Sequence, residues 1–175
     1  MATTSHRCRP LALLVAALLS GLAGLVVLLP ATAHAEDGYR YWNYFHLKGG
    51  SWEFSQVGAG DYQPKDGAVE AYRFGTSTVA KGVTPRANPR QLGFAEICAN
   101  VEEEPGRKRV AVLFDYGNEA DAEGASLPDA RAACAVVDEG ANGQQVLEEV
   151  AVVRVEKSLT CAIDGYPAAG CGEPG

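Results

Sequence analysis

The alternation of large apolar and polar side chains predicts a sheet-dominated chain that begins with an aromatic hairpin. Residues 39–47 and 51–57 are rich in Tyr, Trp and Phe, and Lys48-Gly49-Gly50 separates them. This is the turn chemistry of a β-hairpin. Four further strands are predicted, at residues 69–75, 109–117, 150–156 and 158–164. Both faces of 109–117 are apolar, so this strand belongs in the centre of the sheet.

Three short segments carry helical patterns, at residues 91–99, 128–137 and 143–150. In the first, Leu92, Ala95 and Ala99 fall on one helical stripe. The second begins with Pro-Asp and continues with helix formers, as a first helical turn often does. We therefore predict an α+β fold, with a mainly antiparallel sheet and two or three short helices.

The length of the hairpin loop decides which aromatic side chains share a face. A two-residue loop pairs Phe45 with Phe54 and leaves seven side chains on the opposite face: Arg40, Trp42, Tyr44, His46, Ser51, Glu53 and Ser55. A three-residue loop changes the parity and places Trp42 and Tyr44 with Trp52 and Phe54. In either register both faces carry aromatics. The second face therefore needs cover from the domain itself, from a partner or from a ligand.

The N-terminus has the order of a secretory signal peptide. Arg7 and Arg9 precede an uncharged apolar run over residues 11–30, and Ala33 and Ala35 follow in a small-x-small arrangement. This order predicts a signal peptide at residues 1–35 and one exported domain over residues 36–175, with a secreted, extracellular location. The alternative is an uncleaved apolar segment that retains the protein at the membrane.

The charge of the predicted mature chain excludes one class of partner. All 22 acidic residues follow residue 35, whereas two of the 15 basic residues precede it, which leaves 13 bases and a net charge of −9. Nucleic acids and anionic headgroups need clustered Lys and Arg. We therefore expect no nucleic-acid binding.

The cysteines also indicate export. Four follow the predicted signal: Cys98, Cys134, Cys161 and Cys171. An even number in an exported domain predicts two disulfides. Of the three possible pairings, Cys98–Cys134 with Cys161–Cys171 is favoured because sequence-local bonds require least from the fold. There is no C-x-x-C pair, and a single histidine follows residue 35, so no metal site and no cofactor is predicted.

No pattern in the chain favours catalysis. His46 is the only histidine after residue 35, and there is no G-x-S-x-G motif. We interpret His46 as a surface residue paired with Glu53 or solvent, and Asp115 as a turn former after its strand. The protein is therefore predicted not to be an enzyme. A hydrolase of unknown type is kept as an alternative, which a deep pocket with converging acids would support.

Two binding surfaces are predicted instead. The leading hypothesis is a ligand-binding face of Trp42 and Tyr44 surrounded by Arg40, His46 and Glu53, for a small molecule or a membrane transporter component. The alternative is a secreted protease inhibitor or protein-contact module. Its disulfide loop, residues 161–171, would present Tyr166 and Pro167 in a preorganised conformation.

Several motifs together point to a family: YRYWNYF, GGSWEF, DGAVEAYRF, FAEIC, RVAVLFDYG and CAIDGYPAAGC. Over residues 36–172 the chain resembles a family of exported, uncharacterised actinobacterial (Streptomyces-type) proteins. Its members are often encoded beside components of energy-coupling-factor transporters. The resemblance implies an accessory role outside the membrane, through ligand capture or contact with a transporter. It implies no catalytic residue.

Overall fold

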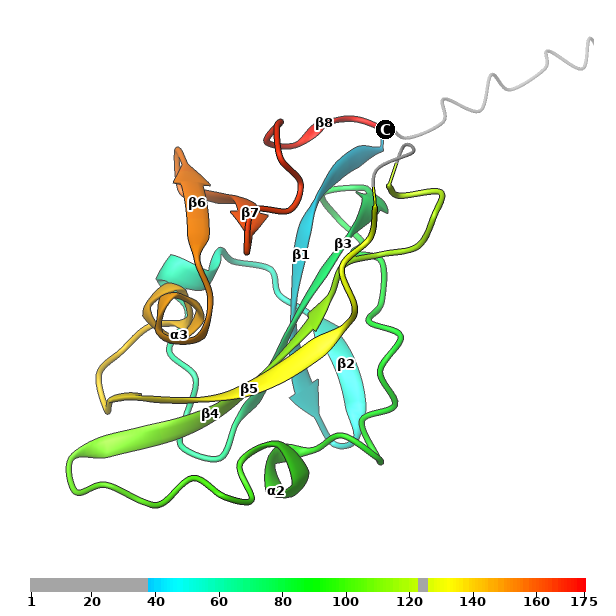
Figure 1. Ribbon diagram of the computed structural model, residues 1–175. Coiled ribbons are helices and arrows are strands. Elements are labelled where there is room, and N and C mark those ends of the chain that lie inside the picture. Colours follow the sequence, from blue (N-terminus) through cyan, green and yellow to red (C-terminus); the bar gives the residue numbers. More distant parts are fainter. Residues whose placement is uncertain (1–37, 123–125) are drawn as a thin grey trace, which may run out of the picture. The chain divides into compact units, whose positions relative to one another are not determined.

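The computed structural model describes residues 38–122 and 126–175, so the predicted signal peptide lies outside the described residues. A main sheet has the strand order β2-β1-β3-β4-β5, and β8 pairs with the start of β1 (Figure 1). The strands are β1 (Tyr39–Lys48), β2 (Ser51–Phe54), β3 (Val69–Ser77), β4 (Arg107–Asp115), β5 (Arg131–Asp138) and β8 (Glu173–Pro174). A separate two-stranded sheet contains β6 (Val153–Glu156) and β7 (Leu159–Ile163).

The main sheet is mixed rather than purely antiparallel. β3 and β4 run parallel, with Ala71 opposite Leu113, whereas the other strand pairs are antiparallel. A parallel pair needs a crossover connection, and residues 78–106 supply it. This crossover carries the short helix α2 (Phe94–Ile97).

The hairpin has the two-residue loop. Lys48 pairs with Ser51 and Phe45 with Phe54, while Gly49 and Gly50 have φ values of +56° and +79°. Two consecutive positive φ values are the requirement of a type I′ turn, which glycine meets without strain.

Two of the three predicted helices are present. α3 (Gly143–Val150) coincides with the predicted segment and buries Val146 and Leu147. Its first turn is closed by a capping box, in which the Asn142 side chain accepts from the Gln145 amide and the Gln145 side chain accepts from the Asn142 amide, each at 3.0 Å. α2 occupies only the middle of 91–99.

The helix predicted at 128–137 is wrong, because this segment forms β5. Its side chains alternate: Ala135 and Val137 enter the core on the α3 side, whereas Cys134 packs on the other face of the sheet. Alanine-rich composition favours a helix by propensity alone. Pairing with β4 over eight residues, together with the disulfide at Cys134, outweighs that preference here.

Both faces of the sheet are covered by the protein. On the α3 side the core contains Trp42, Tyr44, Tyr72, Phe74, Phe114 and Tyr116. On the opposite face Phe45, Ala71 and Leu113 pack with Leu47, Trp52 and Phe54. The aromatic side chains on the second face of the hairpin are therefore covered by other parts of the domain.

The disulfides are Cys98–Cys134 and Cys161–Cys171, which confirms the favoured pairing. The first joins the end of α2 to β5, and the second closes the loop between β7 and β8. Two such bonds are typical of proteins from oxidising environments outside the cytosol.

Replacing Cys98 and Cys134 together by Ser is expected to lower the free energy of unfolding by about 2–4 kcal/mol. The two cysteines are 36 residues apart, and the closed loop contains β4 with the irregular segments on either side of it, so the bond restricts the unfolded chain strongly. Chemical denaturation of the double variant beside the wild-type protein measures the effect. Equal denaturation midpoints would contradict this role of the bond.

Candidate functional site

The side chains predicted to form an open aromatic face are part of the core. Trp42, Tyr44 and His46 are only 3%, 7% and 5% exposed. The Trp42 ring lies 5.6 Å from Phe74 and 5.2 Å from Tyr116, between ring centroids. These three side chains therefore do not form an open surface.

His46 does not pair with Glu53. Its Nδ1 lies 2.6 Å from Oε2 of Glu70, and its ring stacks on Tyr62 with centroids 3.8 Å apart. Glu53 is exposed and accepts a 2.8 Å hydrogen bond from Lys48. His46 has Glu53 opposite it on β2 and Glu70 opposite it on β3, but its side chain is buried against Glu70 and Tyr62. The interpretation of His46 as a surface residue was wrong because the hairpin pattern alone does not reveal the pairing of β1 with β3.

The phenols next to this pair are held in their neutral form. Burial, followed by the nearby Tyr72 and Glu70, raises the pKa of Tyr44 far above its ordinary range. Burial and Glu70 likewise raise the pKa of Tyr72. The Tyr44 hydroxyl has no hydrogen-bond partner within the described residues. The group therefore packs as neutral aromatic core around one histidine–carboxylate pair.

Asp115 is more than a turn former, because it is the centre of a buried ion-pair network. Its Oδ1 accepts from Arg73 at 2.7 Å and from Arg86 at 2.6 Å, and its Oδ2 accepts from the Arg86 amide at 2.8 Å. Burial opposes the charged form, but the hydrogen bonds from Arg86 and Arg73 outweigh it and hold the pKa of Asp115 below its ordinary value. The network fixes the loop after β3 to the end of β4.

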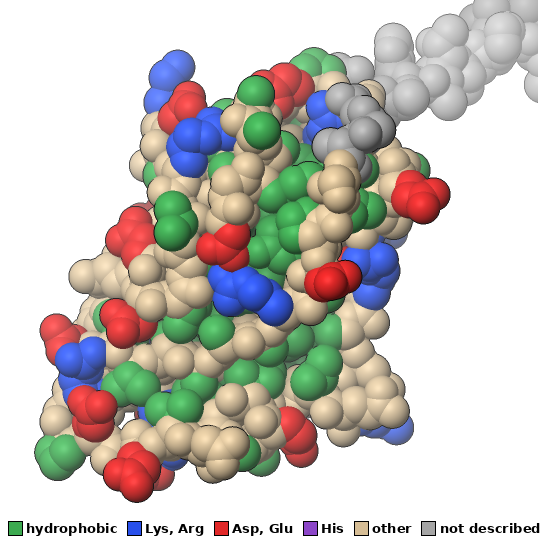
Figure 2. Space-filling view, viewed as in Figure 1, with side chains coloured by type: hydrophobic (Ala, Val, Ile, Leu, Met, Phe, Trp, Pro, Cys, Tyr) green, Lys and Arg blue, Asp and Glu red, His purple; other side chains and the backbone are tan. Residues whose placement is uncertain are grey.

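A cleft of about 520 Å³ lies beside the C-terminal disulfide loop. We call it the C-terminal cleft. In Figure 2, hydrophobic side chains line a hollow between the C-terminal loop and the chain that leads into β5. Phe74 and Tyr166 contribute aromatic surface, and Arg40 and Tyr41 enter from β1. The walls include Asp121, Ala122, Ser126, Pro128, Asp164, Pro167, Ala168, Ala169 and Glu173.

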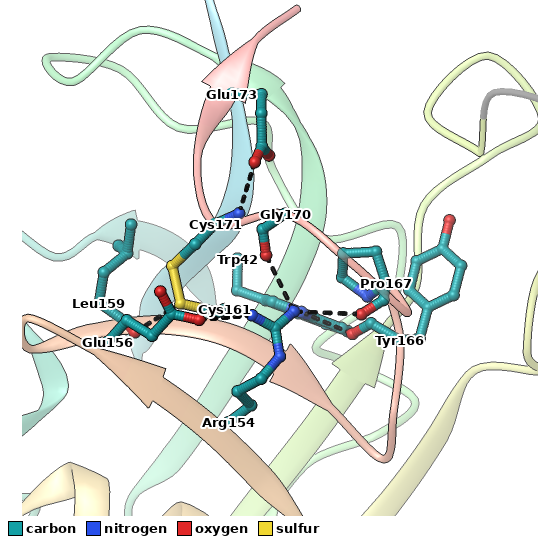
Figure 3. Close-up of a disulfide and its surroundings, with 10 residues drawn as sticks. All are labelled: Trp42, Arg154, Glu156, Leu159, Cys161, Tyr166, Pro167, Gly170, Cys171 and Glu173. Carbon is teal, nitrogen blue, oxygen red and sulfur yellow. Dashed lines mark hydrogen bonds and ion pairs between the residues drawn. A yellow bond between two sulfur atoms is a disulfide. The ribbon is translucent and has the colours of Figure 1, made fainter.

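Arg154 and Trp42 hold the disulfide loop through hydrogen bonds to its backbone, as Figure 3 shows. Nη2 of Arg154 donates to the carbonyl oxygen of Gly170 at 2.9 Å and lies 3.4 Å from that of Pro167. The indole of Trp42 donates to the carbonyl of Tyr166 at 3.1 Å. With the disulfide, these contacts preorganise one wall of the cleft.

Two acidic side chains of the cleft, Asp121 and Asp164, are paired with cations of the protein. Asp164 accepts from Nε of Arg131 at 2.9 Å and from the Tyr116 hydroxyl at 2.8 Å, and Asp121 lies 3.3 Å from Arg73. Burial opposes the charge of Asp164, but these donors keep its pKa below the ordinary value. Asp164 is therefore an ionised, oriented acceptor at the edge of the cleft.

The cleft unites residues from both predicted binding surfaces. Arg40 comes from the predicted aromatic face, and Tyr166 and Pro167 come from the predicted contact loop. Tyr166 is not presented at the tip of that loop, however, because it is 7% exposed and packs edge-on against Phe74 and Tyr116. The small side chains of Ala168 and Ala169 are exposed instead.

The cleft also uses residues that sequence reasoning missed. Tyr41 and Phe74 line it, although both lie in strands that were predicted. The alternation of apolar and polar residues in those strands predicts which face is buried. It does not predict where the segments packed against that face leave a cleft. Asp121 also lines the cleft, from a segment outside every predicted strand and helix.

One group of metal-ligating side chains is found within residues 38–122 and 126–175. It contains Glu156, Cys161 and Cys171, whose ligand atoms lie within 4.8 Å of one another. The two sulfur atoms are bonded to each other and therefore offer no thiolate. In the same described residues, no helix combines the length and apolar character needed to cross a membrane.

Comparison with known proteins places the chain in a family. A family model described as the SCO2322-like domain matches residues 34–175, which include both disulfides and the whole C-terminal cleft. No curated protein and no solved structure matches the chain. Because the family model covers most of its length, the chain belongs to the SCO2322-like domain family.

Proposed function

We propose that the protein is a non-enzymatic exported domain that binds a small molecule in the C-terminal cleft. The observation that carries this proposal is a preformed cavity of about 520 Å³, which lies within the size range of small-molecule sites. Its lining combines the aromatic residues Tyr41, Phe74 and Tyr166 with small side chains and a few oriented polar groups. The secretory pattern of residues 1–35 and the two disulfides support a location outside the cell.

The charges around the cleft favour a neutral or cationic ligand. Its described lining contains three carboxylates, on Asp121, Asp164 and Glu173, and one cation, Arg40. The chain as a whole is acidic, with a net charge of −7 before any cleavage. An anionic ligand would approach against this field. The ligand that fits has an apolar body, to pack beside the aromatic lining, and a donor that reaches Glu173, because Asp121 and Asp164 are already paired with arginine side chains of the protein.

The resemblance to proteins encoded beside transporter components supports an accessory role for this binding. In this account the domain captures its ligand outside the cell and presents it to a membrane transporter component. A rigid cleft suits such a role, because little ordering is needed when the ligand binds.

Replacing Ala168 by Trp is expected to weaken ligand binding at least 10-fold. Ala168 is exposed at the wall of the cleft, so an indole there would fill the entrance without disturbing the core. A thermal-shift screen of small aromatic amines and amides identifies ligands for the wild-type protein, and calorimetry then measures their affinity for the variant.

Ala99→Trp is the matched control, because Ala99 is also exposed but does not line the cleft. Both variants should unfold within about 0.5 kcal/mol of the wild-type protein, as surface substitutions usually do. Ligands that bind Ala168→Trp as tightly as Ala99→Trp would place the site elsewhere and overturn the proposal.

A further inference from the structure

Exposed apolar side chains gather along one edge of the main sheet. Of the seven large hydrophobic side chains that are exposed in the described part of the chain, four line a single groove of about 390 Å³. These four are Tyr39, Val57, Val79 and Leu159. They come from four separate segments of the chain, and we call their surface the edge groove. Such gathering on one surface is a mark of a binding site, whereas scattered exposed side chains are ordinary.

The edge groove lies where β1 lacks a neighbouring strand. β2 pairs with β1 over residues 45–48, and β8 pairs with it over residues 39–40. Among the described residues, no strand pairs with residues 41–43 on this side. Tyr41 and the segment 54–58, which leaves β2, line the groove at this interruption. The site is therefore built into the sheet edge.

A small inner pocket continues the groove. Its volume is about 120 Å³, and it shares Tyr41, Phe54 and Leu159 with the groove. Its other lining residues include Trp42 and Tyr72 of the core. A molecule in the groove could therefore place a ring or short chain against buried aromatic surface.

The edge groove and the C-terminal cleft differ in the charge of their lining residues. No charged side chain occurs in the described lining of the groove or of its inner pocket. The cleft, in contrast, is lined by Arg40 and three carboxylates. The groove and the cleft share only Tyr41 and Gly172 among their described lining residues. An uncharged surface on an acidic protein offers no partner to a charged ligand, which would lose its hydration without compensation.

We propose that the edge groove is a second ligand site, which takes an uncharged and largely apolar small molecule. The lack of charge in its lining selects against ions, and its volume suits a molecule of one or two fused rings with a short substituent. The inner pocket receives the narrow end of that molecule beside Trp42 and Tyr72. This site is independent of the function proposed for the C-terminal cleft.

The test uses N-phenyl-1-naphthylamine, an uncharged apolar fluorophore, with protein exported by cells that express the full chain. Saturable fluorescence enhancement is expected for the wild-type protein. Val79→Asp should weaken it at least 10-fold, because a carboxylate would then stand in the groove. Val152→Asp should bind within 2-fold of wild type. The two valines are 75% and 78% exposed, so they are matched in all but location.

Ala168→Trp, which blocks the C-terminal cleft, should leave binding of the fluorophore unchanged, so the two proposals fail separately. Equal binding by Val79→Asp and Val152→Asp, or no saturable binding by the wild-type protein, would overturn the groove site. Sedimentation velocity tests whether a second copy of the chain, rather than a small molecule, occupies the groove. A dimer that forms in the wild-type protein and dissociates in Val79→Asp would show that a second copy occupies the groove, which also overturns the proposal.

Discussion

The Asp115→Asn variant is expected to lose about 3–5 kcal/mol of its free energy of unfolding at neutral pH. The substitution removes a buried negative charge and leaves the Arg73 guanidinium, whose side chain is only 3% exposed, without its closest partner. It also weakens the bonds from Arg86 that hold the loop after β3. Urea denaturation measures the loss. Asp129→Asn is the control, because Asp129 is exposed, and it should change stability by less than about 0.5 kcal/mol.

The pH dependence of the same comparison gives a second test. The folded protein holds the pKa of Asp115 below its unfolded value, so its contribution is fully present above the unfolded pKa of about 4. That contribution is lost as the pH falls through the lower, folded pKa. The stability difference between wild-type protein and Asp115→Asn should therefore be constant from pH 7 to about 5 and shrink below about 4. A difference that stayed constant down to pH 2 would contradict the ion-pair account.

Replacing Trp42 by Ala is expected to cost about 3–5 kcal/mol, the usual loss for a large aromatic side chain removed from a core. Trp42 packs against Phe74 and Tyr116, and its indole donates to the carbonyl of Tyr166, so the substitution also weakens the support of the disulfide loop. Thermal and chemical denaturation measure the effect.

Val79→Ala is the comparison for Trp42→Ala, because Val79 is 75% exposed and its truncation should be nearly neutral. An unchanged stability in Trp42→Ala would show that Trp42 is not a core residue. It would then return this side chain to the open binding face that the sequence pattern first suggested.

Sequence patterns predicted those elements that depend on residues close together in the chain. Gly49-Gly50 and the flanking alternation specify the hairpin, and Asn142 with Gln145 specifies the start of α3. The disulfides were also predictable, because each joins cysteines that are consecutive along the chain. The turn and the helix start depend on neighbouring residues, and the disulfide pairing follows the order of the cysteines along the chain.

Features that depend on strand order were not predictable. The sequence of β5 predicts a helix, and only its pairing with β4 shows that it is a strand. The partner of His46 is known only once β3 is placed beside β1. The role of Asp115 depends on Arg86, which lies 29 residues earlier in a loop. Such contacts join segments that carry no mutual signal in a single sequence.

Some residues of the C-terminal cleft were predicted from local sequence patterns, whereas their position in one cleft depends on strand order. Tyr166, Pro167 and Arg40 were singled out in the sequence, but as members of two separate surfaces. The structure brings them into one cleft because β8 returns the C-terminal segment to the start of β1, with Glu173 opposite Arg40. Trp42 stands behind this cleft as a support for its wall, through the hydrogen bond to Tyr166.

The most direct test of small-molecule binding in the C-terminal cleft is native mass spectrometry of protein from the culture medium of its natural host. We predict a chain of residues 36–175 that lacks the four hydrogens of two disulfides. We also predict a bound small molecule on the wild-type protein and on Ala99→Trp that is missing from Ala168→Trp. The same bound mass on Ala168→Trp, or no bound mass on any of the three proteins, would contradict the account.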